Sequence, residues 1–220
     1  MGGIHKILHP LGDTTVLHQA LRSFCKCESI AGLVVICRQQ DIGEFRRSIA
    51  EIEDELHQPV VVTAGGETRQ QSVQRGILAL PFPVEYVAIH DGARPLIRPA
   101  DIEHVIADAR ISGAATLGVP VKDTIKTVQN GVITATPDRA SLWQTQTPQV
   151  FRLALYCQAM ELAAAQGKDY TDDCQLVEAL GIPVTMTAGS YSNIKLTTPD
   201  DFAVAEALLK LRTKEAQSNG

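Results

Sequence analysis

Short apolar runs rich in Val, Ile and Ala alternate with amphipathic segments along most of the chain, and this alternation constrains the fold most. We expect strands at 32–37, 59–64, 85–91, 114–121 and 183–188, and helices at 15–24, 42–56, 72–80, 99–113, 151–165, 171–180 and 199–213. The strand runs are continuously apolar, which is typical of strands covered on both faces. The sequence therefore predicts an α/β fold with a doubly wound, mostly parallel, Rossmann-like sheet.

Length and composition restrict the class of protein. The 220 residues suffice for one well-filled domain over 1–220, and no apolar run approaches the length of a membrane span or a secretory signal. A net charge of -5 argues against a nucleic-acid partner, because binding to nucleic acid generally requires a basic surface. The five cysteines are odd in number and scattered, which predicts reduced thiols in a cytoplasmic protein.

A hairpin interrupts the alternation. Residues 124–137 form two alternating stretches around Asn130–Gly131, the dipeptide most typical of two-residue hairpin turns. No helix separates the two stretches, so we expect an arm of about 122–147 that projects from the sheet. An isolated hairpin is marginal in water, and a second subunit is the surface on which we expect it to rest.

The loops after the strands carry the candidate binding groups, since ligands of open parallel sheets bind at the carboxyl ends of strands. "AGGETRQQS" (64–72) offers two glycines and a helix N-terminus to an anion or a base edge, although Ser72 as the cap of an ordinary turn stays open. "HDGARP" (90–95) places Asp91 and Arg94 at a strand end, where a carboxylate suits Mg²⁺ or ligand hydroxyls. A pair that only braces the loop is the alternative.

Further polar groups flank the hairpin and end the last strand. Arg139, Thr124 and Thr147 offer a cation and two hydroxyls to a phosphate or polyol, although each alone is more often an ordinary exposed side chain. Lys195 in "SNIKLTTPDD" (192–201) stands at the upper edge of the sheet, where a lysine meets an anion or extends to solvent.

Taken in order, these segments resemble one family. "GGETRQQSV", "HDGARP", "PVKDTIK", "DRASLWQTQTPQVF", "TDD" at 171–173 and "NIKLTTPDD" are similar to the 2-C-methyl-D-erythritol 4-phosphate cytidylyltransferase family from about position 5 to 212. The resemblance implies a fold of the nucleotide-diphospho-sugar transferase type and a homodimer joined through the arm. It also implies a nucleotidyltransferase of non-mevalonate isoprene biosynthesis, which joins CTP and methylerythritol phosphate and releases pyrophosphate, with Mg²⁺ as cofactor.

The resemblance also implies residue roles. Gly66 and Ser72 would contact the cytosine, Asp91 the nucleotide–metal or hydroxyl region, and Lys195 the α-phosphate and attacking oxygen. Lys6 matches the family's catalytic lysine, so the implied catalytic residues are Lys6, Asp91, Arg139 and Lys195. The implied sugar phosphate pocket consists of Arg94, Thr124, Arg139, Thr147 and Thr171, with Thr124 and Arg139 serving the partner's site.

The start of the chain departs from the family pattern. His5 and Ile7 stand beside Lys6 where the family has Pro and Gln. Members carry a strand and a glycine-rich loop, A-A-G-x-G-x-R-M-G, before that lysine, and Met1–Gly2 match only its last two residues. The free-energy cost of losing a central strand would exceed the roughly 5–15 kcal/mol that separates a typical folded protein from its unfolded state. Our hypothesis is that Met1 is an internal methionine. The most informative observation is whether a strand of this chain pairs beside 32–37 and 85–91 or whether a gap is left there.

Two alternatives stay open at this point. A pentitol-phosphate cytidylyltransferase acting on ribitol 5-phosphate would share most of these motifs, and the acceptor pocket around Arg139 and Thr171 would decide between the two acceptors. A truncated, non-catalytic homologue would keep the fold and lose the ability to hold a triphosphate.

Overall fold

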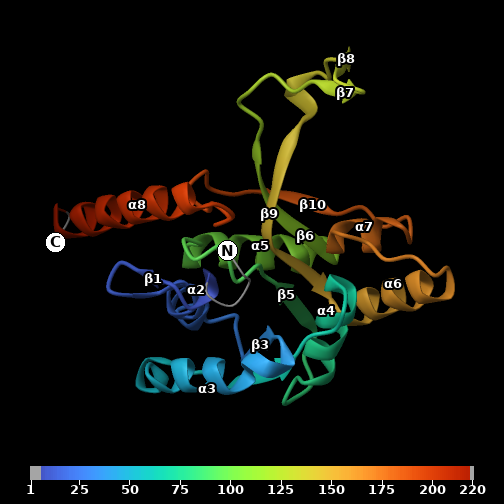
Figure 1. Ribbon diagram of the computed structural model, residues 1–220. Helices are drawn as coiled ribbons and strands as arrows, with labels where there is room; N and C mark the ends of the chain where they lie inside the picture. The colour runs from blue at the N-terminus through green and yellow to red at the C-terminus, as the bar shows by residue number, and fades with distance from the viewer. Residues whose placement is uncertain (1–5, 219–220) are drawn as a thin grey trace.

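The structure is a computed structural model that describes residues 6–218. Its body contains a four-stranded sheet of order β10-β6-β9-β5 and a parallel pair, β3-β4 (Figure 1). The strands are β3 (Leu33–Cys37), β4 (Val60–Ala64), β5 (Tyr86–Ile89), β6 (Ala114–Pro120), β9 (Trp143–Arg152) and β10 (Thr185–Ala188). The helices are α2 (Val16–Cys25), α3 (Ile42–Ala50), α4 (Arg69–Leu78), α5 (Pro99–Ser112), α6 (Leu153–Ala165), α7 (Asp173–Glu178) and α8 (Pro199–Ser218). The predicted α/β class is confirmed.

Helices cover both faces of the four-stranded sheet, as the continuously apolar strands predicted. Neighbouring residues of β9 point to opposite faces, since successive side chains of a strand alternate. Val150 packs in a cluster with Val105 of α5, and Phe151 packs in a second cluster with Tyr156 of α6. Each of these four side chains is almost completely buried.

Local signals explain where several helices begin and end. Pro99 occupies the first turn of α5, and Gly113 ends the helix in the left-handed conformation (φ 86°). α4 begins at Arg69, earlier than expected, because the hydroxyl of Thr68 accepts from the backbone N–H of Gln71. α3 ends at Ala50 and a short 3₁₀ turn, Glu53–Glu55, follows, so the expected helix over 42–56 is too long.

The strand β9 is the longest strand that sequence analysis missed. It pairs antiparallel with both β5 and β6 and occupies the centre of the four-stranded sheet. Its sequence, WQTQTPQVFR, contains a proline and buried polar side chains, so its pattern is not that of an apolar core strand. The expected helix 151–165 consequently begins only at Leu153.

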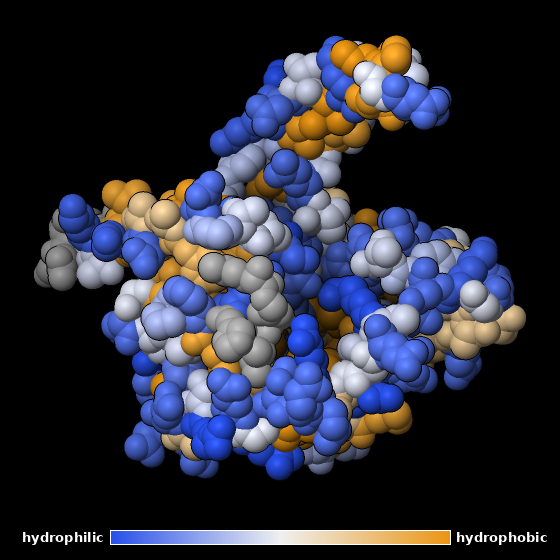
Figure 2. Space-filling model, viewed as in Figure 1, coloured by the Kyte–Doolittle hydropathy of each residue, from blue (hydrophilic) through white to orange (hydrophobic). Residues whose placement is uncertain are grey.

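The hairpin is confirmed and projects from the body (Figure 1). Its strands β7 (Thr127–Gln129) and β8 (Val132–Ala135) flank Asn130 (φ 50°) and Gly131 (φ 79°). Two central residues with positive φ match the tight turns that twist with their strands. Val132 and Ile133 expose 66% and 59% of their surface, and apolar patches are visible on the arm in Figure 2.

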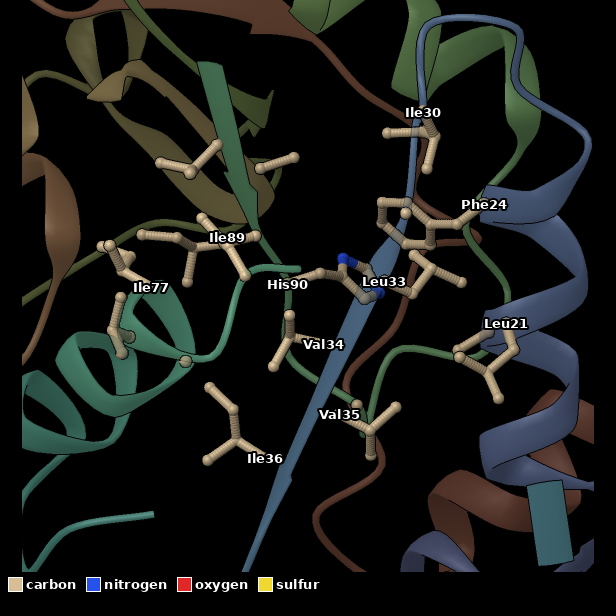
Figure 3. Close-up of a pocket in the computed structure, with 18 of the residues that line it drawn as sticks. Leu21, Phe24, Ile30, Leu33, Val34, Val35, Ile36, Ile77, Ile89 and His90 are labelled. Atoms are coloured by element: carbon tan, nitrogen blue, oxygen red, sulfur yellow. The ribbon is translucent and has the colours of Figure 1, made fainter. Parts of the chain in front are cut away.

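A cavity of about 830 Å³ separates β3 from β5. Within residues 6–218, β3 pairs only with β4 and β5 pairs only with β9, so no described strand joins the two sheets. Figure 3 shows Val34 and Val35 of β3 beside this cavity, with Phe24 of α2, Ile77 of α4 and Ile89 of β5 around it. Within residues 6–218 there is therefore a gap between β3 and β5 in place of a strand. Met1 and Gly2, on which the hypothesis about the start of the chain depends, lie outside the described residues.

Smaller features complete the description. β1 (Pro10–Leu11) and β2 (Thr14–Thr15) form a short antiparallel ladder before α2. Every cysteine is a free thiol. None of the helices within 6–218 has the length and apolar character that crossing a bilayer requires.

Candidate active site

Asp91 is the centre of a charged cluster at the carboxyl ends of the strands. It follows β5 by two residues, and its carboxylate meets three cations. Lys195 Nζ lies 2.7 Å from Oδ2, Arg69 Nη1 lies 3.1 Å from Oδ1, and Arg94 Nε lies 3.9 Å from Oδ2. The three cations come from the segment after β10, the start of α4 and the turn after β5, so the fold brings distant loops to one rim.

The electrostatics of this cluster favour an anionic ligand. Burial alone would raise the pKa of Asp91, but the hydrogen bond from Lys195 and the charges of Lys195, Arg69 and Arg94 lower it below its ordinary value. The carboxylate is therefore ionised at neutral pH. Lys6 and the half-exposed Lys195 line the same cavity mouth as Asp91. In Figure 2 a hollow with an apolar floor and hydrophilic rim opens below the arm.

Arg69 links this cluster to a buried carboxylate that the sequence did not single out. Its Nη2 lies 2.5 Å from Oδ2 of Asp173, whose side chain is only 4% exposed. The hydroxyl of Tyr156 donates to Oδ1 of Asp173 at 2.6 Å. Burial raises the pKa of Tyr156, and the neighbouring charge of Asp173 raises it further, so the phenol stays protonated as a donor. The "TDD" motif contained this residue, but its burial is a tertiary property.

His90 and Thr147 form a second support for the same turn. The ring of His90 is partly buried, and this burial lowers its pKa to about 4, so the imidazole is neutral at physiological pH. His90 Nε2 lies 3.1 Å from the carbonyl oxygen of Arg94, and His90 Nδ1 lies 3.0 Å from the Thr147 hydroxyl. That hydroxyl also accepts from the backbone N–H of Asp91 at 3.0 Å.

The glycine loop before α4 packs against its own helix. The N–H of Gly66 donates to the hydroxyl of Ser72, which donates to the carbonyl of Thr68. A β-carbon at Gly66 would collide with the side chain of Gln71, so only glycine permits this turn. Thr68, and not Ser72, caps the helix, while Ser72 ties the loop to the first turn.

The sequence-predicted residues occupy four kinds of position in this chain. Lys6, Asp91, Arg94 and Lys195 come together at the rim. Thr171 is exposed, two residues before the buried Asp173, and thus near the same cluster. Thr124 and Arg139 are exposed on the arm, and Arg139 Nη1 donates to the carbonyl of Lys122 at 2.7 Å. Thr147 is buried and its hydroxyl points to Asp91 and His90.

The end of the "NIKLTTPDD" segment has a structural role through Asp201. Its carboxylate accepts from the N–H groups of Thr197 and Thr198, both at 2.6 Å, and caps the start of α8. These backbone hydrogen bonds lower the pKa of Asp201 to about 2. Asp201 therefore anchors the segment that carries Lys195.

No group of three or more His, Cys, Asp or Glu side chains within residues 6–218 is arranged to hold a metal ion. Asp91 contributes one carboxylate to the rim. Magnesium typically takes one or two carboxylates together with substrate phosphates, and retains several waters. The single carboxylate of Asp91 is compatible with a magnesium ion that bound phosphate groups also hold, and residues 6–218 form no separate metal cage.

Comparisons with known proteins agree with this geometry. The family model described as 2-C-methyl-D-erythritol 4-phosphate cytidylyltransferase matches residues 1–211. A protein of that name from Desulforamulus reducens is 53% identical over 203 residues, which cover 92% of this chain and 86% of the relative. One from Syntrophotalea carbinolica is 45% identical and covers 94% of this chain and 88% of its own length.

Solved structures show the same relationship. The crystal structure of the enzyme from Thermus thermophilus superposes with a TM-score of 0.80 at 31% identity, and covers 95% of this chain and 96% of that one. The structure of 4-diphosphocytidyl-2C-methyl-D-erythritol synthase from Anaerococcus prevotii gives a TM-score of 0.83 at 28% identity, and covers 91% of this chain and 88% of that one. These matches support the methylerythritol interpretation over the ribitol alternative.

Proposed function

The chain belongs to the 2-C-methyl-D-erythritol 4-phosphate cytidylyltransferase family, and from this premise we propose how its rim joins CTP to 2-C-methyl-D-erythritol 4-phosphate. The family assignment makes it a nucleotidyltransferase of the isoprenoid pathway. The observation that carries the residue assignment is the meeting of Lys195, Arg69 and Arg94 on Asp91, with Lys6 at the same cavity mouth.

In the proposed reaction, a phosphate oxygen of methylerythritol phosphate attacks the α-phosphorus of CTP. A new P–O bond forms, the bond between the α-phosphorus and its bridging oxygen breaks, and pyrophosphate leaves with the electron pair. Phosphoryl transfer of this kind depends mainly on positioning and charge neutralisation. Lys6 and Lys195 would supply positive charge beside the triphosphate, and Asp91 would hold Lys195 ready at 2.7 Å until the substrate competes for it.

Arg94 would direct its positive charge toward the acceptor phosphate. Its side chain is fixed by donation to the carbonyl of Asn193 at 2.7 Å, and its Nε is buried with no hydrogen-bond partner among the described residues. A bidentate guanidinium contact is well suited to a phosphate. Thr171 would line the same pocket, and the loop of Gly66 and Ser72 would shape the cytosine site.

Magnesium is proposed as the cofactor, held by the substrate phosphates and by Asp91. When bound, it would offset charge on the triphosphate. Arg69 and Lys195 each contact one oxygen of Asp91. When the nucleotide enters, the magnesium ion would therefore have to replace one of these two side chains on the carboxylate.

A homodimer is proposed in which the arm contacts the partner. Val128, Val132 and Ile133 expose more than half of their surface on the arm, which supports a covered state in an assembly. In this arrangement Thr124 and Arg139 would serve the partner's site, since both are exposed on the arm. We also propose the cytoplasm as the location, which the free thiols support.

Pyrophosphate release tests the proposal. We expect release from CTP with methylerythritol phosphate, and at least tenfold less with ribitol 5-phosphate. Lys195→Met should lower kcat by about 10²–10³-fold, the usual effect of removing a group that stabilises transition-state charge. Lys210→Met, at an exposed position of α8, is the matched control. Equal turnover of the two acceptors, or full activity of Lys195→Met, would contradict the proposal.

A further inference from the structure

We propose that Tyr191 is a positioning residue that joins the base of the arm to the segment that carries Lys195. The position of the arm would then set the position of this lysine at the rim. The effect on turnover rests on the proposed function, whereas the contacts of Tyr191 do not.

The side chain of Tyr191 makes two contacts with the base of the arm. Its hydroxyl donates to the carbonyl oxygen of Pro120 at 2.7 Å. The ammonium of Lys122 lies over its ring, with Nζ 3.5 Å from the ring centroid, and a cation at this distance is attracted by the aromatic face. Pro120 ends β6, so both contacts lie where the arm leaves the sheet (Figure 1).

Lys122 also connects the two sides of the arm. Nη1 of Arg139, on the returning side, donates to the carbonyl of Lys122 at 2.7 Å. The N–H of Val121 donates to the carbonyl of Leu142 at 3.0 Å. These two hydrogen bonds join the outgoing and returning segments just beyond the end of β6. A contact on Lys122 therefore acts on both sides of the arm.

The segment that contains Tyr191 leads directly to the charged rim. Lys195 follows Tyr191 by four residues, and its Nζ lies 2.7 Å from Oδ2 of Asp91. Between them, Asn193 is completely buried, and its carbonyl accepts from Nη1 of Arg94 at 2.7 Å. Because only three residues separate Tyr191 from Lys195, the connection has little slack, and a movement at one end would be felt at the other.

The neighbouring residue ties the same segment to the body of the molecule. Nη2 of Arg212, on α8, donates to the hydroxyl of Ser192 and to the carbonyl of Leu96, both at 2.8 Å. Tyr191 points instead to the arm, and 44% of its surface is exposed. Its position is therefore set by its contacts with Pro120 and Lys122 more than by packing in a core.

The test separates the two contacts of Tyr191. Tyr191→Phe removes the hydrogen bond to Pro120 and keeps the ring, whereas Tyr191→Leu removes both contacts. Tyr86→Phe is the matched control, because the Tyr86 hydroxyl and ring likewise contact a cation, Arg152. This pair lies at the end of β9 that is opposite to the arm.

Two amides report on the two sides of the proposed connection. The N–H of Val121, bonded to Leu142, reports on the base of the arm. The N–H of Asn193, which donates to the carbonyl of Ser190 at 3.0 Å, reports on the lysine segment. Hydrogen exchange of both amides and the kinetics with CTP and methylerythritol phosphate are measured on each variant, and urea unfolding confirms that each is folded.

We expect Tyr191→Leu to speed the exchange of both amides about five- to tenfold, as the loss of contacts of this size implies. Its kcat should fall about 5–20-fold through misplacement of Lys195, with KM for CTP changed less than about threefold. Tyr191→Phe should show smaller changes in the same direction, because its ring still meets Lys122. Lys122→Met added to Tyr191→Leu should cause little further change, since both substitutions remove one contact.

Three results would overturn the inference: an unchanged Asn193 amide in Tyr191→Leu, an unchanged kcat in that variant, or simply additive effects of Lys122→Met and Tyr191→Leu. If Tyr191→Leu fails to fold, Tyr191→Phe gives the same readouts. If the unaltered chain releases no pyrophosphate, the proposed function fails, while the exchange of the two amides still decides whether Tyr191 joins the arm to the lysine segment.

Discussion

Arg69 is the residue whose loss should reveal how the charged rim is held together. The change Arg69→Met removes the guanidinium and keeps most of the side-chain volume. It leaves Asp173, 4% exposed, with the Tyr156 hydroxyl as its remaining strong partner at 2.6 Å. Removal of one member of a buried ion pair costs about 3–5 kcal/mol. Since Arg69 is 34% exposed and therefore partly screened, we expect a loss of about 2–3 kcal/mol.

Urea unfolding followed by circular dichroism measures this loss. For a chain of this size, about 1 kcal/mol corresponds to about 2–4 °C in Tm, so the melting temperature should fall by about 5–10 °C. Arg75→Met is the matched control, because Arg75 is an exposed residue of the same helix and its guanidinium donates to the carbonyl of Gly65. It should cost less than about 1 kcal/mol.

A double mutant separates the ion pair from general damage to α4. In Arg69→Met with Asp173→Asn, the buried charge is gone and the amide can still accept from Tyr156. The double variant should therefore be more stable than Arg69→Met alone by about 1 kcal/mol. The reasoning would be refuted if Arg69→Met cost less than about 0.5 kcal/mol, or if the two changes were simply additive.

Three further predictions concern other parts of the chain. The folded pKa of Asp201 is about 2, below its ordinary value of 3.8, so its contribution to stability is present above about pH 4 and is lost as the pH falls toward 2. Asp201→Asn keeps a capping side chain but does not titrate. The free energy of unfolding of this variant should therefore change less between pH 4 and pH 2 than that of the unaltered chain. Val132→Thr with Ile133→Thr should shift the proposed dimer toward monomer in sedimentation velocity, and an unchanged mass would exclude the arm as the contact. Amides on the open edge of β3 should exchange faster than those of β6, which is paired on both sides; equal protection would contradict the described sheet.

The sequence predicted most elements because local chemistry decides them. Pro99 and Gly113 mark the ends of α5, and Asn130–Gly131 mark the hairpin, since each needs a backbone conformation that few other residues adopt. The strand β9 was missed because its buried polar residues, among them Gln146 and Gln149, find partners or burial only through tertiary structure. A periodicity argument treats such residues as exposed, so it cannot detect a strand of this kind.

The candidate site was predicted in part for the same reason. Asp91, Arg94 and Lys195 follow strands, and topology brings strand ends together, so their convergence was predictable. The contact between Arg69 and Asp173 joins residues 104 positions apart, and no local pattern announces it. The contacts of the Thr147 hydroxyl with Asp91 and His90 likewise depend on tertiary packing, so a sequence motif could not predict them.

The charge balance at Asp91 favours ligand binding over loop bracing, the two interpretations of this residue that the sequence left open. A carboxylate that only braces a loop needs one cation, and Arg94, from the same turn, is the partner that the bracing interpretation named. The structure instead places Arg94 at 3.9 Å and brings Lys195 and Arg69 closer. Three cations against the carboxylates of Asp91 and Asp173 leave one positive charge, and Lys6 adds a second at the cavity mouth. Bracing explains none of this surplus, which costs free energy through repulsion unless an anion offsets it. In the proposed function, the triphosphate of CTP would supply that offset.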